Sequence, residues 1–536
     1  MQQILRAEPG LTIAVRPDRC GGTSATIDGL RACGRLAASA ALAALLAGCR
    51  VGPDFHRPAP PEVPSYTSAP ATPDLTPGAD EPAQRLIADQ SIPAAWWKLF
   101  RSPPLDTVVR QALAGSPTIA AARSRLASAQ QAVLEARGAD DPQVDAAASA
   151  ERLKGPPFAL GTTVHHFLPT YNLYTVGATV SFVPDVFGLS ARRVEQQQAL
   201  AQNRAYQLTA TQLAVTGNAV DQALIIASAW RRTRALEAAV TADEKILALA
   251  RHEFADGKIA RTDVLAAESR LENDRALLPP VRQHVAAAQD ALAILLGRPP
   301  AAFLPPAFDL ADFTLPSELP VSLPSTLVER RPDILAAEAR LHAASAAVGV
   351  ADAQMYPNFT LSASGGMAAL ATSSLGESSN LIWTLLGGLT APIFHGGALS
   401  AQKRAAIDQF QAELATYRQT VLEGLGQVAD LLRSLGHDAE QVRAERLALD
   451  AAGRTLDLQR RRHAAGKTGL LPLLDAERRL ERQRDAYTAA KALRYLDSAR
   501  LFVALGGGWW QNAQTRPQPG GPAATRHVSD AASGLP

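Results

Sequence analysis

An apolar residue recurs at every seventh position through a long proline-free stretch in the second half of the chain. The stretch runs from Ala398 to Arg462. Its repeat positions are Leu414, Val421, Val428, Leu435, Val442, Leu449 and Leu456. A sustained seven-residue apolar repeat flanked by charge is typical of a helix packed on neighbours as a coiled coil. At ~1.5 Å per residue the stretch predicts a rod roughly 100 Å long. Taken alone, the pattern also fits a cytosolic coiled coil.

A glycine-containing turn follows this rod at His463–Gly469. Pro472 then fits the first turn of a returning helix, Leu473–Leu505, because first-turn residues need no intrahelical N–H bond. The two helices predict a long hairpin with its tip near residues 464–470.

The first half of the chain shows the same hairpin pattern. A proline-free helical segment runs over Leu189–Ala255, and Gly257 marks the turn. Thr262 is predicted to cap a returning helix that ends near Leu296, with a kink at Pro279–Pro280.

Each half also contains two segments with the two-residue period of strands. The first half has Pro142–Glu151 and Tyr174–Phe182, separated by a predicted loop at 152–172. The second half has Pro357–Leu370 and Leu381–Phe394. The alternation predicts two strands per half.

The two halves are related by duplication. Helical residues from Pro117 to Ala129 reappear from Pro332 to Ala344 at an offset of 215. Residues from Gly257 to Leu271 reappear from Gly466 to Leu480 at an offset of 209. The offset changes in the loop between the two strands. Each half is therefore predicted to contain, in order, a helix, a strand, a loop, a strand, a very long helix, a turn and a returning helix. This order predicts a mainly α fold with a small β part.

Composition excludes several classes of protein. The net charge of +2 gives no sign of nucleic-acid binding. Aromatic residues make up only 5%, which fits helical walls better than thick globular cores. The 3 cysteines all lie in the first fifty residues, so the body has neither a disulfide framework nor a cysteine metal site. The histidines are scattered, and no phosphate-binding loop or nucleophile elbow is present. We therefore expect no enzyme activity and no cofactor.

The N-terminus has the features of a bacterial lipoprotein signal. Arg31 and Arg35 precede an apolar run, Leu36–Ala47, which is too short for a membrane anchor. Small residues then lead to Cys49, which resembles a lipidated cysteine. Arg50, in place of an aspartate, points to the outer membrane. A chance cysteine after an apolar run is the alternative, and residues 1–30 are unusual enough to suggest a misplaced start codon.

Four strands are too few to close a membrane barrel, because the smallest known barrels have about eight. Three copies would supply twelve strands and leave no free edge. The pattern thus predicts a trimeric barrel that continues into a hollow cylinder of helices. A small soluble sheet is the alternative.

Five motifs carry a family resemblance. They are Cys49–Asp54 (CRVGPD), Trp96–Phe100 (WWKLF), Arg331–Ile334 (RPDI), Ala391–Gly397 (APIFHGG) and Leu473–Glu477 (LLDAE). Through them the chain resembles the outer-membrane efflux proteins, or TolC-like channels, and most closely the OprM/NodT-type lipoprotein channels of tripartite RND drug pumps. The resemblance implies a homotrimer with a twelve-strand barrel in outer-membrane lipid and a periplasmic α-helical tunnel. It also implies a periplasmic adaptor (membrane fusion) protein and an inner-membrane RND transporter as partners.

The resemblance further implies a periplasmic gate at the hairpin tip. Asp475 matches the aspartate that rings the constriction, Leu471 a hydrophobic gate position and Arg478 a basic residue of the tip network. Three inward-facing carboxylates would repel one another and favour cations. Alternatively, Asp475 is an ordinary first-turn acid favoured by the helix dipole. Asp263, in the corresponding region of the first half, is a weaker candidate for tip contacts, and it fits helix capping or simple solvation at least as well.

Gly257 and Gly466 are predicted to serve the geometry of the two tip turns. The predicted division of the chain is a signal peptide with its extension at 1–48, a lipidated extended segment at 49–104, repeats at 105–296 and 326–508, a Pro-rich equatorial connector at 297–325, and a disordered tail at 509–536. The predicted function is a passive efflux duct. The alternatives are a type I protein-secretion duct and a periplasmic coiled-coil scaffold without a pore.

Overall fold

The computed structural model describes residues 50–513, apart from 69–74, 76–81, 89 and 155–169. The predicted signal peptide, Cys49, most of the predicted loop at 152–172 and the tail beyond residue 513 lie outside this range. The chain divides into two units at Arg50 and Val51, and the description that follows concerns the unit that begins at Val51.

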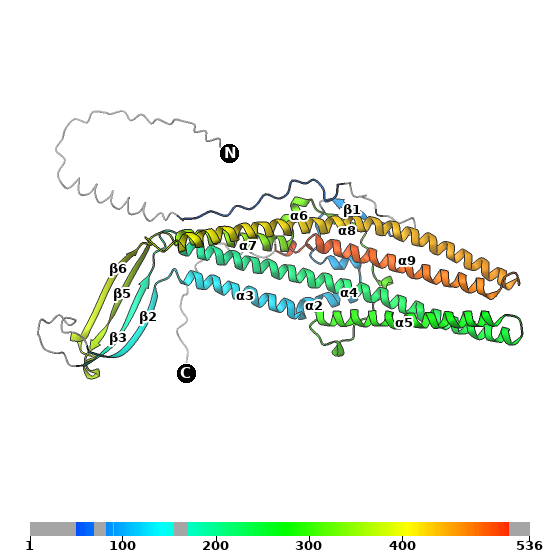
Figure 1. Ribbon diagram of the computed structural model, residues 1–536, viewed down its shortest axis with the longest axis horizontal. Coiled ribbons are helices and arrows are strands. Elements are labelled where there is room, and N and C mark those ends of the chain that lie inside the picture. Colours follow the sequence, from blue (N-terminus) through cyan, green and yellow to red (C-terminus); the bar gives the residue numbers. More distant parts are fainter. Residues whose placement is uncertain (1–49, 69–74, 76–81, 89, 155–169, 514–536) are drawn as a thin grey trace, which may run out of the picture. The chain divides into compact units, whose positions relative to one another are not determined.

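Two helices of 67 residues each, α4 and α8, form the longest elements (Figure 1). Each is ~100 Å long at ~1.5 Å per residue. The helices are α2 Pro103–Gly115, α3 Pro117–Gly138, α4 Leu189–Ala255, α5 Arg261–Leu295, α6 Pro324–Arg330, α7 Pro332–Ala353, α8 Ala398–Ala464, α9 Leu470–Ala504 and α10 Trp510–Ala513. The helix predicted at 189–255 is confirmed, and the one predicted at 398–462 continues for two more residues.

The predicted duplication is confirmed by the element boundaries. Both ends of α3 and α7 differ by 215 residues, and both ends of α4 and α8 differ by 209. Helices α5 and α9 also differ by 209 at both ends. In each half the long helix packs on its returning partner, α4 on α5 and α8 on α9, and α4 also packs on α9.

The returning helices begin earlier than the sequence predicted. Helix α9 starts at Leu470, with Pro472 in its first turn as expected. Helix α5 starts at Arg261, so the prediction that Thr262 caps it is wrong. The cap is Ala260, whose N–H donates to Asp263 Oδ2 at 3.1 Å. Helix α5 continues through Pro279–Pro280, which are both exposed, so water can bond the carbonyls that the prolines leave free.

Four strands form one antiparallel sheet in the order β2-β3-β5-β6. The strands are β2 Gln143–Leu153, β3 Tyr171–Phe182, β5 Asn358–Ala369 and β6 Leu381–Thr390. The sheet lies at the end of the long helices opposite the hairpin turns (Figure 1). The two predicted strands per half are confirmed, and the first pair extends into the predicted loop by two residues at Arg152–Leu153 and two at Tyr171–Asn172.

The segment before the first helix is anchored rather than simply extended. Strand β1, Arg85–Ala88, pairs in parallel with β4, Glu318–Val321, which lies in the predicted Pro-rich connector. Gln84 is fully buried beside β1, and Leu75 is 3% exposed. Two segments that read as linkers therefore form a small sheet of their own, because partners more than 200 residues away satisfy their backbone groups.

The main hydrophobic core lies where this small sheet meets the helices. Trp96 stacks on Phe502 with ring centroids 5.5 Å apart, and both side chains are buried. The Trp509 indole donates to Arg330 O at 2.8 Å, so the first residues of the predicted tail are packed. Among the described helices, α7 is long and apolar enough to cross a membrane, but 61% of its apolar window is buried, as in a core helix.

Candidate membrane sheet and tip gate

The strand register sorts the side chains of the sheet onto two chemically different faces. Directly paired residues of antiparallel strands share a face. Val180 pairs with both Val144 and Ala363, and Ala363 pairs with Leu385, so these four lie on one face. The other apolar or small residues of this face are Ala146, Ala148, Ala150, Tyr174, Val176, Ala178, Phe182, Phe359, Leu361, Gly365, Met367, Ala369, Leu381, Trp383, Gly387 and Leu389. The Arg152–Asn172 pair, near the ends of β2 and β3, is its polar exception. Apart from this pair, the face is apolar across all four strands.

The opposite face is mostly polar. It includes Asp145 and Glu151 on β2, and Ser149 bonds Thr175 across two strands at 2.7 Å. Thr384 and Ser364 pair on the same face.

No other part of the described chain covers the apolar face. Trp383 is 76% exposed, Leu385 75% and Val144 68%. In the sheet order, β2 and β6 are the two edges. Ten to twelve residues per strand span ~33–40 Å at ~3.3 Å per residue, enough to cross a bilayer core when tilted.

The two hairpin tips close with the same backbone bonds. Lys258 N donates to Glu253 O at 2.9 Å, and Lys467 N donates to Arg462 O at 2.8 Å. Each bond closes a Schellman turn around a glycine with positive φ, +71° at Gly257 and +66° at Gly466. No atom lies within 4 Å of a Cβ added at either glycine, so backbone conformation rather than space favours glycine there.

Asp475 lies six residues into α9 and is exposed. The first turn of α9 holds no acid, so the reading of Asp475 as a first-turn dipole residue is wrong. Its neighbours fit this exposure, because Leu474 packs on the α4–α5 hairpin and Ala476 packs on α8. Asp475 belongs to neither of these clusters. Asp263, by contrast, caps α5.

Leu471 is 41% exposed and Arg478 is half-buried on the same helix. Within the described part of the chain, neither Asp475 nor Arg478 forms a hydrogen bond or ion pair. Subtracting the repeat offset places Thr262, Ala266 and Ser269 at the corresponding positions of α5. The candidate gate side chains thus occur only in the second repeat.

A buried arginine joins the two hairpins beside Asp475. Arg270 Nη1 donates to Leu474 O at 2.6 Å, and its Nε lies 2.8 Å from Asp243 Oδ1. The side chains of Arg270 and Asp243 are 5% and 0% exposed. Burial raises the pKa of Asp243 to about 6, although the Arg270 charge lowers it. Sequence reasoning missed this pair, because a single polar residue in a long helix resembles a solvated position.

A second, partly buried charged cluster lies further along the hairpins. Arg500 donates to Asp221 Oδ2 at 3.1 Å and to Asp497 Oδ1 at 3.2 Å. Asp438 is 5% exposed, and its Oδ2 has no hydrogen-bond partner among the described residues. Burial and the Asp497 charge raise the pKa of Asp438 to about 7, against the opposing charge of Arg494.

The described residues contain no group of three or more His, Cys, Asp or Glu side chains able to hold a metal ion. Arg270 and Arg500 each join two helices, α5 to α4 and α9 to α4. Such pairs can hold the helices in register, but they offer no nucleophile and base in an open site.

Comparisons with known proteins agree with this architecture. The profile of the outer membrane efflux protein family matches residues 108–298 and 323–507. The pyoverdine export outer membrane protein OpmQ of Pseudomonas aeruginosa is 30% identical over 431 residues, or 80% of this chain and 90% of its own. The toluene efflux pump outer membrane protein TtgF of Pseudomonas putida is 28% identical over 485 residues, or 89% of this chain and 98% of its own. The solved outer-membrane channel OprN matches with a TM-score of 0.76 at 28% identity, covering 86% of this chain and all of its own.

Proposed function

The chain belongs to the outer membrane efflux protein family, and on this premise we propose that it is the exit duct of a tripartite efflux pump. Members of the family are channels of the outer membrane and not enzymes. The duct would export small molecules passively, with its periplasmic tip opened by partner proteins.

The amphipathic sheet is the observation that carries this proposal. The apolar face spans four strands, and its Trp383 and Leu385 are about three-quarters exposed. Exposing such a face to water is unfavourable, so it marks a surface that a membrane or another molecule covers. A bilayer would cover it, while the polar face would line a pore. The edges at β2 and β6 would then pair with those of neighbouring copies, and three copies would close a barrel of twelve strands.

Lipid attachment at Cys49 would hold the N-terminus in the outer membrane. The proposed partners are a periplasmic adaptor and an inner-membrane RND transporter, which would act at the hairpin tips. A partner opens a closed tip only by binding the open state more tightly. We assign the two repeats to 105–296 and 326–508, joined by the connector at 297–325.

The proposed gate consists of Asp475, Leu471 and Arg478. Asp475 is exposed and forms no bond within the described residues, so its carboxylate is available to face its copies across a three-fold axis. Three such carboxylates at one constriction would attract cations and repel anions.

Single-channel conductance in planar bilayers tests the proposal. We expect the wild type to give a small, cation-selective conductance, and Asp475→Ala to raise the conductance or reduce the selectivity. Asp408→Ala is the matched control, because Asp408 is an exposed acid on α8 near the opposite end of the helix. If both substitutions changed the conductance and selectivity equally, the assignment of Asp475 to the gate would be wrong.

The alternatives predict different results. A protein-secretion duct would conduct but would assemble with a transporter that exports polypeptides. A periplasmic scaffold would form no pore and would be soluble once its lipid is removed. Absence of conductance from a folded trimer would overturn the duct proposal.

A further inference from the structure

The two repeats carry different charges at one equivalent pair of positions. In the second repeat, Arg340 on α7 pairs with Glu413 on α8, and its Nη2 and Nε lie 2.9 and 3.0 Å from Glu413 Oε1. The repeat offsets of 215 and 209 residues place Arg125 on α3 and Arg204 on α4 at the corresponding positions. Helices α3 and α4 pack on each other as α7 and α8 do. The first repeat therefore has two cations where the second has an ion pair.

The three arginines of these two pairs line one pocket with a volume of about 480 Å³. Its walls come from α3, α4, α7 and α8, which pack on one another in that order. Ala122, Ala336 and Ala337 add apolar surface to the walls. The pocket thus combines positive charge with apolar surface, as expected of a site for a small organic anion.

Neither arginine of the first repeat has a carboxylate partner. The two acids that line the pocket, Glu413 and Asp333, each pair with another arginine, at 2.9 and 2.8 Å. Arg204 Nη1 donates to the neutral Gln207 Oε1 at 2.7 Å. Arg125 forms no hydrogen bond or ion pair with the described residues. A guanidinium can donate two parallel hydrogen bonds to a carboxylate, so both side chains are able to bind an added one.

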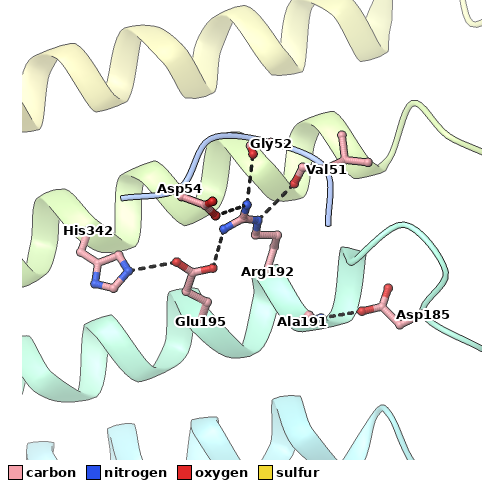
Figure 2. Close-up of polar contacts among 8 residues, drawn as sticks. All are labelled: Val51, Gly52, Asp54, Asp185, Ala191, Arg192, Glu195 and His342. Carbon is pink, nitrogen blue, oxygen red and sulfur yellow. Dashed lines mark hydrogen bonds and ion pairs between the residues drawn. The ribbon is translucent and has the colours of Figure 1, made fainter. Parts of the chain in front are cut away.

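A chain segment covers one face of α7. Arg192 of α4 donates from Nε to Val51 O and from Nη2 to Gly52 O, both at 3.1 Å, and so holds the start of this segment (Figure 2). Phe55 then stacks on His342 of α7, with ring centroids 4.4 Å apart.

The pocket occupies the opposite face of α7. Arg57, further along the covering segment, donates from Nε to Glu338 Oε2 at 2.8 Å. Ala336 and Arg340, which line the pocket, are each two residues from Glu338, or roughly 200° around the helix. A duct needs an open lumen, so in the proposed assembly the covered face is the outer one and the pocket lines the lumen.

We propose that Arg125 and Arg204 form a binding site for small organic carboxylates in the wall of the duct. The carboxylate of the ligand takes the place that the Glu413 carboxylate holds in the second repeat, and the alanines contact the apolar body of the ligand. The site rests on the proposed function for its place in the lumen. It would give anionic cargo a point of attachment along the tunnel.

Titration calorimetry of the full-length protein in a non-ionic detergent tests the site. Benzoate is the probe, and benzamide, which has the same ring without the charge, is its neutral counterpart. The titration is made at low ionic strength, where salt screens exposed charges least. We expect benzoate to bind and benzamide to bind at least about tenfold more weakly, a difference of ~1.4 kcal/mol or more.

Arg204→Glu is the main variant, because Glu413 shows that a glutamate fits at the equivalent position of the second repeat. The added carboxylate should pair with Arg125 and lower the affinity for benzoate at least about tenfold. Arg123→Glu is the matched control, because Arg123 is exposed on α3 but does not line the pocket. Its affinity for benzoate should equal that of the wild type.

Equal affinity of the wild type for benzoate and benzamide would overturn the proposal, as would wild-type affinity for benzoate in folded Arg204→Glu. If that variant does not fold, Arg125→Gln takes its place, and undiminished benzoate binding would then overturn the site. The measurement is independent of conductance. Arginine-dependent binding by a protein without a pore would contradict the duct but not the site, and a pore without benzoate binding would contradict the site alone.

Discussion

The Arg270 guanidinium lies 2.6 Å from the carbonyl oxygen of Leu474, the residue immediately before Asp475. Arg270 belongs to the returning helix of the first hairpin, and Leu474 belongs to that of the second. Arg270 also lies 2.8 Å from buried Asp243 and 3.8 Å from Glu477. One side chain therefore connects both hairpins at the level of the proposed gate, and its loss should separate them.

We predict that Arg270→Met loosens the tip. The substitution leaves Asp243 buried without its cation, which typically costs about 3–5 kcal/mol, and it frees the Leu474 carbonyl. Thermal unfolding should occur at a lower temperature, and single-channel conductance should rise. Arg479→Met is the control, because Arg479 occupies the same position in the second repeat but is exposed. Equal conductance in the two variants would contradict a role of Arg270 at the tip.

We predict that Asp438 makes stability fall as the pH rises. Its folded pKa of about 7 exceeds the ordinary 3.8, so the folded state binds the proton more tightly than the unfolded state. The free energy of unfolding should therefore decrease between about pH 4 and pH 7, by at most about 4 kcal/mol, and stay low above pH 7. The charged groups that act on it are Asp497, Arg494, His437 and Arg500.

Asp438→Asn removes the titrating group. Its melting temperature should fall less between pH 5 and pH 8 than that of the wild type. The control is Asp430→Asn, because the Asp430 side chain on the same helix is 79% exposed. A wild-type pH dependence retained in full by Asp438→Asn would assign the effect to other groups.

The helices and strands followed from the sequence because their signals are local and repeated. The boundaries of α4 and α8 came from heptads and from the absence of proline, and the duplication supplied a second copy of each element. The tip turns followed from Gly257 and Gly466 for the same reason. Each of these features depends on residues within a few turns of one another.

The buried charges could not be predicted, because their partners are distant in sequence. Arg494 donates to Gln84 Oε1 at 2.8 Å and to Leu75 O at 2.8 Å, more than 400 residues away. A segment rich in Pro, Ala and Thr gives no periodic signal, so its buried Gln84 looked like any solvated glutamine. Only the three-dimensional path of the segment shows that its carbonyls satisfy a guanidinium.

We predict that Arg494→Met detaches the segment around β1. Arg494 is 2% exposed, and its loss leaves Gln84 with an unpaired buried oxygen. An unsatisfied buried polar group costs about 1–3 kcal/mol. Hydrogen exchange of the β1 amides should accelerate while that of the hairpin tips stays unchanged. The control is Lys491→Met, one helical turn away. Uniform acceleration throughout the protein would indicate global destabilisation instead.

We predict that Gly466→Val destabilises the second tip turn. A β-branched residue at φ +66° would destabilise the turn by at least about 1–2 kcal/mol, because L-residues other than glycine disfavour the left-handed conformation. No neighbouring atom would block its Cβ. Protease cleavage within the turn at 465–469 should become faster. Gly453→Val, in the interior of α8, is the comparison, because that glycine also has open space around it but ordinary helical φ. Equal cleavage rates in Gly466→Val and Gly453→Val would contradict the claim that the positive φ at position 466 requires glycine.

Two neighbouring residues of β6 separate the proposed lipid face from the proposed pore face. Leu385 pairs with Ala363 on the apolar face, and Thr384 pairs with Ser364 on the polar face. Arginine on a lipid-facing position near the bilayer midplane costs about 2–4 kcal/mol, whereas a pore-facing position stays hydrated.

Leu385→Arg should therefore lower the yield of trimer assembled in lipid vesicles, measured as the heat-resistant band on gels. Thr384→Arg should assemble normally and reduce cation selectivity, because three added positive charges would line the pore. The matched pair changes the same strand by the same residue, so equal assembly of the two variants would contradict the assignment of the apolar face to lipid.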